Sequence, residues 1–282
     1  MITCNLMGGL GNQIFQIFAT IAYSIKSKNK FQFLAQETLG GGSCTLRYTF
    51  WNTFFSSLKP FLITNLPPVN VIRENGFTYN ELPVGSMVET NVLIYGYFQS
   101  DKYFKDQFEM ICRVIGLEKK KQSVLDTLRL NKEDLNNTIS MHFRLGDYKK
   151  LSDFHPIATP QYYENALNHF NSKFPEEKFI ILYFCEDQDI NDVQITIQNL
   201  ENKFLNYKFI RGDNTLPDWQ QMLYMSVCRH NIIANSSFSW WGAYFNNNNT
   251  DKVVCYPSVW FGQTANIDTK DLCPQEWVKM NC

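Results

Sequence analysis

The sequence predicts an α/β fold in which parallel strands alternate with helices. The first observation is the second half of the chain, where short apolar runs alternate with segments of helical periodicity, as in βαβ units. The second is the opening, where the apolar run at residues 1–6 leads through a glycine turn into an amphipathic segment. The third is that polar residues gather directly after apolar runs, and ligands of open α/β sheets bind at the carboxyl ends of strands.

The first half of the chain predicts two strands and two helices. After the strand at 1–6, apolar residues at 14–25 repeat at helical spacing and form one apolar face. Residues 36–68 are rich in Gly, Ser, Pro and aromatics, which is typical of long loops around a ligand cleft. A strand is predicted at 92–97 and an aromatic helix at 102–115. The charged, largely helical segment 119–135 is a plausible connection between halves.

The second half predicts a regular alternation of five strands and four helices. The strand at 138–143 is expected to be buried, because it is a short run of apolar and β-branched residues. The remaining strands are predicted at 179–184, 207–210, 231–234 and 252–256. The helices are predicted at 161–171, 190–200, 219–228 and 239–245.

Composition narrows the class of protein. With 282 residues, 44% hydrophobic and 15% aromatic, the chain predicts a packed globular enzyme. A net charge of −1 and a pI near 6.4 exclude the electrostatic footprint of a nucleic-acid-binding protein. The sequence contains neither a signal peptide nor an apolar run long enough to span a bilayer, so we expect a soluble, cytoplasmic protein. Its eight cysteines form no C-x-x-C pair, which argues against a zinc site or a disulfide framework.

The polar residues that follow the strand at 138–143 are the most informative feature. His142, Arg144, Gly146, Asp147 and Tyr148 occur together where that strand ends. Arginine suits a phosphate because its planar fork of donors binds oxyanions bidentately. The alternative is that Arg144 and Asp147 form an ion pair at a surface turn.

A glycine turn between the first strand and the first helix is the second candidate site. Glycines there let the backbone approach a ligand, and a helix N-terminus offers free N–H groups to an anion. The turn is not a dinucleotide fingerprint, because Ile14 stands where the third glycine is required. The alternative is a tight strand–helix turn with Asn12 as the cap. The segment contains Gly8, Gly9, Gly11, Asn12 and Gln13.

A third cluster follows the strand at 231–234. Hydroxyls combined with helix N-terminal amides are suited to a diphosphate, although N-capping by a single serine explains part of the pattern. Of Trp240 and Trp241, one could stack on a sugar or a base, but adjacent helical residues face differently, so at least one is expected in the core. The short polar side chains are Asn235, Ser236, Ser237 and Ser239.

An acidic segment after the strand at 179–184 permits three interpretations. Asp187 and Asp189 could bind a divalent cation, cap the next helix, or place a carboxylate against the amide edge of a guanine base. We favour the cap or the base contact, because no further clustered carboxylates complete an oxygen cage.

Four segments in order resemble the alpha-1,2-fucosyltransferase family (glycosyltransferase family 11). They are GGLGNQIFQ at 8–16, GYFQSDKYF at 96–104, HFRLGD at 142–147 and NIIANSSFSWWGA at 231–243. The third segment matches the family's His-x-Arg-Arg-x-Asp motif with one departure. Leu145 replaces the second arginine, which puts the strength or geometry of donor binding in doubt.

The resemblance implies a GT-B-type architecture, in which two Rossmann-like halves with parallel sheets face a cleft. Residues 1–130 would form the N-terminal half, with the acceptor side and the glycine loop, and 131–282 the donor-binding half. The implied enzyme is a galactoside 2-alpha-L-fucosyltransferase. It would move L-fucose with inversion from GDP-fucose to the 2-hydroxyl of a terminal galactose in a glycan, without a metal or cofactor.

The resemblance and the chemistry assign roles to individual residues. Arg144 is expected to stabilise the leaving diphosphate, and Asp147 is the first choice for the general base, with His142 and His155 as alternatives. The expected catalytic residues are thus Arg144, Asp147 and His142. His155, Tyr97 and Trp240 are assigned to the acceptor. The donor is assigned to Gly9, Gly11, Asn12, Gln13, Asp187, Asn235, Ser236, Ser237, Phe238 and Ser239.

Two other functions stay open from the sequence. One is a glycosyltransferase that uses another nucleotide sugar; guanine and uracil present different edges to the protein, so a donor competition panel separates the two. The other is a catalytically inactive module that binds a nucleotide or a glycan, since a motif does not by itself establish function.

Overall fold

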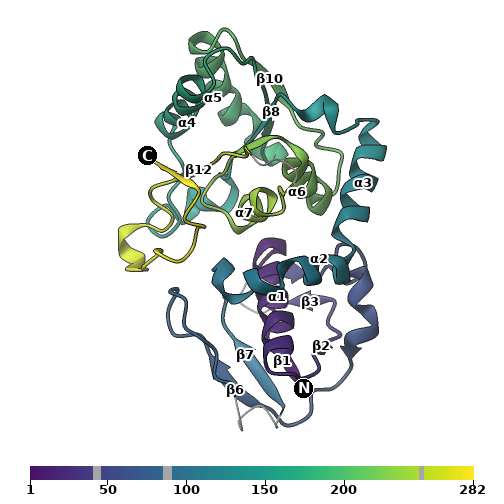
Figure 1. Cartoon of the computed structure of the whole chain (residues 1–282). Helices are drawn as coiled ribbons and strands as arrows, with labels where there is room; N and C mark the ends of the chain where they lie inside the picture. The colour runs from purple at the N-terminus through teal and green to yellow at the C-terminus, as the bar shows by residue number, and fades with distance from the viewer. Residues whose placement is uncertain (41–45, 85–90, 248–250) are drawn as a thin grey trace. The chain divides into compact units, whose positions relative to one another are not determined.

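The chain divides into two units, each with a parallel sheet of its own (Figure 1). The computed structural model describes residues 1–40, 46–84, 91–247 and 251–282. Unit 1 consists of Met1–Lys119 with Ile267–Gln275, and unit 2 of Lys120–Asn266 with Glu276–Cys282. The division after Lys119 differs from the predicted 130/131 because it falls inside the helix α3 (Leu117–Leu128). The predicted cleft between two facing halves stays a prediction.

Unit 1 is built on a three-stranded parallel sheet in the order β1-β7-β6. Its strands are β1 (Ile2–Cys4), β7 (Val92–Tyr95) and β6 (Asn70–Arg73). The helix α1 (Leu10–Lys26) packs on β1, and its apolar residues are buried as predicted. The strand β6 was not predicted, because Val71 is half exposed and the run shows no clear alternation. The C-terminal segment Ile267–Gln275 belongs to this unit.

The region predicted as long loops contains short strand pairs, apart from residues 41–45, which lie outside the described residues. The parallel pair is β2 (Phe33–Leu34) with β5 (Leu62–Ile63), and the antiparallel pair is β3 (Thr38–Leu39) with β4 (Arg47–Tyr48).

The helix predicted at 102–115 is wrong in its first half. Two 3-10 turns, Asp101–Tyr103 and Lys105–Gln107, precede the helix α2 (Phe108–Ile115). The interruption is at Phe104, whose φ of −141° is not helical and whose ring is buried against the aromatic rings of α1. Tertiary packing of this aromatic residue therefore overrides the helical composition.

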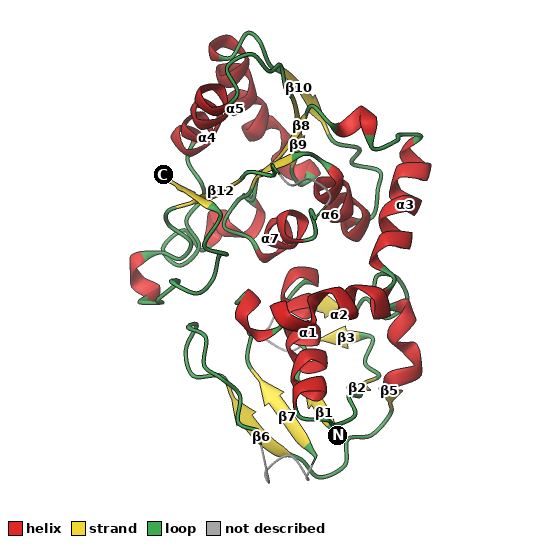
Figure 2. Ribbon diagram, in the orientation of Figure 1, coloured by secondary structure: helices red, strands yellow, loops and turns green. Residues whose placement is uncertain are grey.

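Unit 2 contains a six-stranded, all-parallel sheet in the order β10-β9-β8-β11-β12-β13. Figure 2 labels β8, β9, β10 and β12 of this sheet. The predicted α/β fold with parallel sheets is confirmed. The strand β13 was not predicted, because it has three residues and only two of them are apolar. The strands are β8 (Thr138–His142), β9 (Ile180–Phe184), β10 (Lys208–Arg211), β11 (His230–Ile232), β12 (Val254–Pro257) and β13 (Val278–Met280).

Four helices connect the strands of unit 2, and they match the predicted positions with shifts of a few residues at their ends. They are α4 (Pro160–Lys173), α5 (Ile190–Lys203), α6 (Asp218–Val227) and α7 (Ser237–Tyr244). Numbered along the chain, the strands have the order 3-2-1-4-5-6, which is typical of doubly wound nucleotide-binding sheets. The topological switch point therefore lies between β8 and β11.

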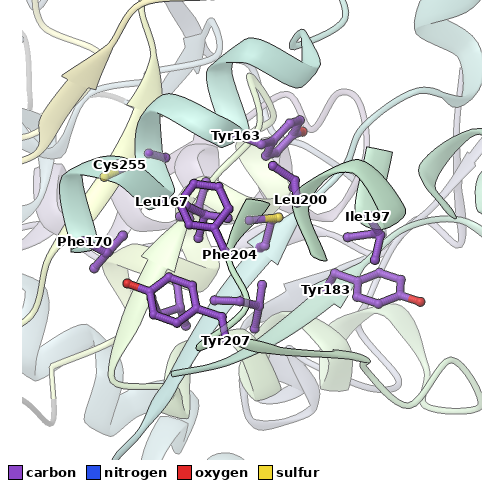
Figure 3. Packing of buried hydrophobic residues seen from close by; sticks show 14 of the residues in the cluster. Tyr163, Leu167, Phe170, Tyr183, Ile197, Leu200, Phe204, Tyr207 and Cys255 are labelled. Atoms are coloured by element: carbon purple, nitrogen blue, oxygen red, sulfur yellow. The ribbon is translucent and has the colours of Figure 1, made fainter. Parts of the chain in front are cut away.

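Alternation along β8 decides which side chains reach the core of unit 2. Ile139 and Met141 belong to a buried cluster with residues of α4 and α5. Figure 3 shows this cluster, in which Leu167 comes from α4 and Ile197 from α5. Ser140 and His142 point to the opposite face, where Asn231 donates hydrogen bonds to Ser140 Oγ and to a main-chain oxygen of α6. Strand β8 thus contributes apolar side chains to the core on one face and polar side chains to the other.

Two findings bear on the expected location and redox state. No helix in the described ranges is long and apolar enough to cross a membrane. The cysteines that the structure describes are free thiols, and those of the strands and of α6's C-terminal end are buried.

Candidate active site

The carboxyl ends of β8 and β11 lie side by side at the switch point of the unit 2 sheet. The turn after β8 carries Arg144 and Asp147, and the turn after β11 carries Ser236 and Ser237. Tyr148 joins the two turns. In doubly wound sheets ligands bind at this place, outside the carboxyl ends of the strands. The fold therefore brings the third and fourth sequence segments together at one site.

Arg144 forms ion pairs with two carboxylates. Its guanidinium donates to Asp147 on the same turn and to Glu186, which follows the neighbouring strand β9. The guanidinium also lies 5.2 Å from the ring centre of Tyr148. The ion pair that was the alternative hypothesis for Arg144 is thus present. It lies at the switch point, where an incoming anion would compete with both carboxylates for the same guanidinium.

His142 is buried at the end of β8. Its ring lies 5.6 Å from the ring of Phe238 in α7, and its Nδ1 atom has no hydrogen-bond partner in the described part of the chain. Burial, with a smaller contribution from Arg144, lowers the pKa of His142 to about 3. A group with so low a pKa is a weak proton acceptor at neutral pH, so an orienting role fits His142 better than that of the base.

His155 is connected to Arg144 through Tyr148. The rings of His155 and Tyr148 stack with centres 4.6 Å apart, and Arg144 lies over the same tyrosine. Burial lowers the pKa of His155 from its ordinary value. The structure therefore places this predicted acceptor residue beside the arginine, on an aromatic surface that also includes Phe154 and Phe261.

The predicted cradle of short polar side chains needs a correction. Asn235 is buried and donates to the main-chain oxygens of Pro156 and Trp260. Ser239 is buried in the first turn of α7, and its hydroxyl donates to main-chain oxygens of the preceding turn. Both side chains stabilise the turn and are inaccessible to a donor. The residue types alone did not indicate that the side chains of Asn235 and Ser239 point inward, toward the main chain.

The remaining members of the cradle form the start of α7. The side chain of Ser236 caps the helix and accepts from the Phe238 N–H at 3.3 Å. Ser237 and Phe238 are half-buried in the first turn, where main-chain N–H groups of a helix are free to bind an anion. Ser236 is therefore the helix cap, and an anion site on the first turn of α7 stays a prediction.

Trp240 is a core residue, and its assignment to the acceptor is wrong. Its side chain is fully buried and packs against Tyr244 and Trp277 at 4.5 and 5.3 Å between ring centres. Trp241 is fully buried as well. Helix α7 is apolar on all sides apart from its first turn, so neither indole reaches the surface.

The side chains of the acidic segment after β9 neither cap α5 nor form a set of metal ligands. Asp187 accepts from Arg211 and Asn214, and hydrogen bonding to Asn214 and Arg211 lowers the pKa of Asp187. Asp189 makes no capping hydrogen bond, and it accepts from Lys149 and from the Gly146 N–H. In the described ranges no group of three or more His, Cys, Asp or Glu could hold a metal ion. The contact of Asp187 with guanine stays a prediction.

In unit 1 the glycine turn is stabilised by the amide side chain of Gln13 and lies close to the side chain of Asn12. Gly8 has a φ of +74°, and a Cβ there would lie 2.4 Å from the Asn12 side chain. Gln13 is buried, and its amide donates to the main-chain oxygens of Gly8 and Tyr48. Gln13 thus supports the turn. Asn12 lies within α1 and is not its cap. The N-cap position is Gly9, which has no side chain to cap the helix.

The first and second sequence segments meet in unit 1. The Gln99 amide donates to Asn12 Oδ1 at 2.9 Å. The turn before Gln99 is fixed by Glu74, which accepts from the N–H groups of Tyr97 and Phe98. Phe98 adopts a φ of +52°, so this turn is a constrained feature rather than a free loop. Gly9 faces open space, whereas Gly11 is buried within α1.

Sequence reasoning missed Glu186, Glu74 and the role of Asp189. The signal that could have found Glu186 and Asp189 is their place directly after β9, because β9 and β8 are neighbours and their carboxyl ends meet. Glu74 directly follows β6, next to β7, and could have been found in the same way once β6 was recognised.

Comparison with known proteins gives one family match and two curated relatives. Residues 72–281 match the model of Glycosyl transferase family 11. The alpha-1,2-colitosyltransferase of Escherichia coli is 27% identical over 301 residues, covering 99% of both chains. The O-antigen biosynthesis glycosyltransferase WbnK of Escherichia coli is 27% identical over 321 residues, covering 99% of this chain and 100% of its own.

Solved structures show weaker likenesses. A mutant of Arabidopsis thaliana FUT1 in complex with GDP has a TM-score of 0.47 at 8% identity, covering 97% of this chain and 74% of its own. A glycosyl transferase family 9 protein from Veillonella parvula has a TM-score of 0.49 at 10% identity, covering 100% of this chain and 85% of its own.

Proposed function

The chain belongs to glycosyltransferase family 11, and from this premise we propose that it is an inverting galactoside 2-alpha-L-fucosyltransferase. It moves L-fucose from GDP-fucose to the 2-hydroxyl of a terminal galactose in a glycan and forms an alpha-1,2 linkage. The observation that carries this proposal is the position of Arg144, which follows β8 at the switch point, beside the first turn of α7.

Arg144 and the start of α7 are the proposed ligands of the donor diphosphate. A guanidinium binds phosphate oxygens bidentately, and free N–H groups of the first turn of α7 add donors, together with the Ser237 hydroxyl. As the bond between fucose and the diphosphate breaks, negative charge grows on the leaving GDP. Preformed donors at that place stabilise the transition state more than the ground state.

Asp147 is the proposed general base. The galactose 2-hydroxyl attacks the anomeric carbon from the face opposite GDP, the bond from that carbon to the phosphate oxygen breaks, and the hydroxyl proton passes to the carboxylate. Asp147 is exposed on the same turn as Arg144. When the diphosphate replaces Asp147 on Arg144, this carboxylate becomes available to the acceptor. The low pKa of His142 makes it the weaker choice.

The reaction is proposed to need no metal or cofactor. The two aspartates that suggested a cation site already accept from positively charged side chains, Asp187 from Arg211 and Asp189 from Lys149. Arg144 provides the positive charge that the leaving diphosphate requires. Transfer is therefore expected to continue in EDTA.

A second donor is favoured by one comparison. The relative described as an alpha-1,2-colitosyltransferase acts, by that name, with a different sugar. Colitose resembles fucose but lacks its 3-hydroxyl, so a single polar contact to that hydroxyl would distinguish the two donors. Such contacts give strong discrimination when the site is built to bind the hydroxyl.

The test is a donor and acceptor panel with the full chain. GDP-fucose, GDP-colitose and UDP-galactose are each offered with several β-galactosides in the presence of EDTA, and the product linkage is determined by NMR. An alpha-1,2-fucosylated product supports the proposal, and a colitosylated product alone replaces the donor. GDP binding without transfer from any donor would favour the inactive binding module.

A further inference from the structure

Asp189 is a buried charge to which the proposed function gives no role. The residue is 2% exposed at the start of α5. Removing a carboxylate from water is unfavourable unless ion pairs and hydrogen bonds compensate. Asp189 nevertheless makes no side-chain hydrogen bond to the helix that it begins. Its burial must therefore serve another part of the fold.

The partners of Asp189 lie on the turn that follows Arg144. The Gly146 N–H donates to Asp189 Oδ2 at 2.7 Å, and Lys149 Nζ donates to Asp189 Oδ1 at 2.7 Å. Both oxygens of one carboxylate are therefore directed at the turn Gly146–Lys150. A charge from the connection between β9 and α5 stabilises the turn after the neighbouring strand β8.

A second carboxylate of the same connection lies against this turn. Glu186 accepts from the Arg144 guanidinium, and a Cβ placed on Gly146 would lie 3.1 Å from Glu186 Oε2. Gly146 has a φ of +33°, which favours glycine. The main chain at Gly146 is thus fixed by a hydrogen bond to Asp189, and the side chain of Glu186 packs against it.

These contacts fix the position of the main chain that carries Arg144 and Asp147. On one side of Arg144 the chain is part of β8, which is bonded to β9 and β11. On the other side Gly146 is bonded to Asp189, and Asp147 follows directly. Reacting groups must be placed to within about an ångström, since a larger displacement costs about 100-fold in rate.

We propose that Asp189 is a positioning residue for the transfer reaction, whose carboxylate places Arg144 for the diphosphate and Asp147 for the acceptor hydroxyl. This inference rests on the roles that the proposed function gives to Arg144 and Asp147. Asp189 does not touch the substrate. It acts through the Gly146 N–H and Lys149. This role explains why an acidic residue follows β9 although it neither caps a helix nor belongs to a set of metal ligands.

The test compares three variants of the full chain. Asp189→Ala removes both contacts, Asp189→Asn keeps an oxygen that accepts from Gly146 but loses the charge, and Asp192→Asn is the matched control. Asp192 is exposed and also accepts from Lys149, so its loss leaves both Asp189 contacts in place. Thermal unfolding, the Kd for GDP, and kcat and KM for GDP-fucose are measured for each.

We expect Asp189→Ala to lower kcat/KM about 100-fold and to weaken GDP binding. Asp189→Asn should recover part of the loss and remain about 10-fold impaired, as the loss of one charged hydrogen bond predicts. Asp192→Asn should match the wild type. Recovery by the conservative variant and a changed Kd are effects that a merely smaller folded fraction would not produce.

Three results would overturn the inference. The first is a folded Asp189→Ala variant with wild-type kcat/KM and GDP affinity. The second is a lower amount of active enzyme with unchanged Kd and KM. If Asp189→Ala does not fold, Asp189→Asn decides, and wild-type kinetics would be the third. Failure of the wild-type chain to bind GDP would instead refute the proposed function, and the inference with it.

Discussion

The Tyr148 hydroxyl donates a hydrogen bond to the main-chain oxygen of Asn235 at 3.1 Å. This contact joins the turn after β8 to the turn after β11, which are the two turns at the switch point of the sheet. Tyr148 also stacks on His155 and lies under Arg144. One side chain therefore links the arginine, the neighbouring histidine and the start of α7.

Removal of the Tyr148 hydroxyl is expected to loosen this link while leaving the ring in place. Tyr148→Phe should lower the free energy of unfolding by about 1 kcal/mol, the usual net value of one hydrogen bond. GDP affinity should fall as well. Urea denaturation and calorimetry measure the two effects. Tyr162→Phe is the matched control, because its hydroxyl bonds main-chain oxygens away from the turn after β8. Equal GDP affinity in both variants would contradict the linking role.

Arg144→Ala is expected to lower kcat about 100- to 1,000-fold, because a preformed donor to the leaving group is lost. Arg144→Lys should recover only part, since lysine keeps the charge but lacks the planar fork. Steady-state transfer from GDP-fucose measures the effect. Arg113→Ala removes an exposed arginine of α2 and should leave transfer unchanged. Wild-type turnover by a folded Arg144→Ala variant would remove this residue from the mechanism.

The stability of the fold is expected to fall as the pH is lowered below about 6.5. The chain has four histidines, and burial lowers the pKa of each, to about 3 for His142 and about 4 for His230. The unfolded chain therefore binds protons at a higher pH than the folded chain. This contribution to stability is complete above the unfolded pKa of about 6.5 and is lost progressively as the pH falls from there toward the folded pKa values.

Urea denaturation between about pH 7 and pH 4.5 measures this loss. The lowered pKa values of Asp187 and Asp251 act only below their ordinary value of 3.8, so they do not contribute in that window. His142→Gln should flatten the decline. An unfolding free energy that stays constant from pH 7 to pH 4.5 would contradict the burial of the histidines.

Leu145→Arg restores the residue usual in the family at this position, and we expect no gain in donor affinity. Leu145 is half-buried and packs against the hydrophobic cluster shared by the sheet, α4 and α5. A guanidinium there would lose apolar contact and lower the free energy of unfolding by roughly 1 kcal/mol, a typical effect of one substitution. Calorimetry with GDP and thermal unfolding test both effects. Leu145→Met is the conservative control. Tighter GDP binding by the arginine variant would contradict this account.

The sequence predicts the fold of unit 2 well, because its strands are short apolar runs separated by amphipathic helices of ordinary length. It also predicts that Arg144 and Asp147 follow a strand. That Glu186 and Asp189 reach the same turn follows from their place after β9 only once β9 is paired with β8, a pairing that the strand positions alone do not assign. Nor could residue types show the direction of a side chain. Asn235 and Ser239 bond the main chain, and Trp240 lies in the core.

The central claim is that GDP binds at the carboxyl ends of β8 and β11. Amide hydrogen exchange of the full chain, with and without GDP, tests it most directly. The account predicts slower exchange in peptides that cover the turn after Arg144 and the first turn of α7, with little change at the β12–β13 edge of the sheet. Binding of GDP that leaves both turns unprotected, and protects another surface, would contradict it.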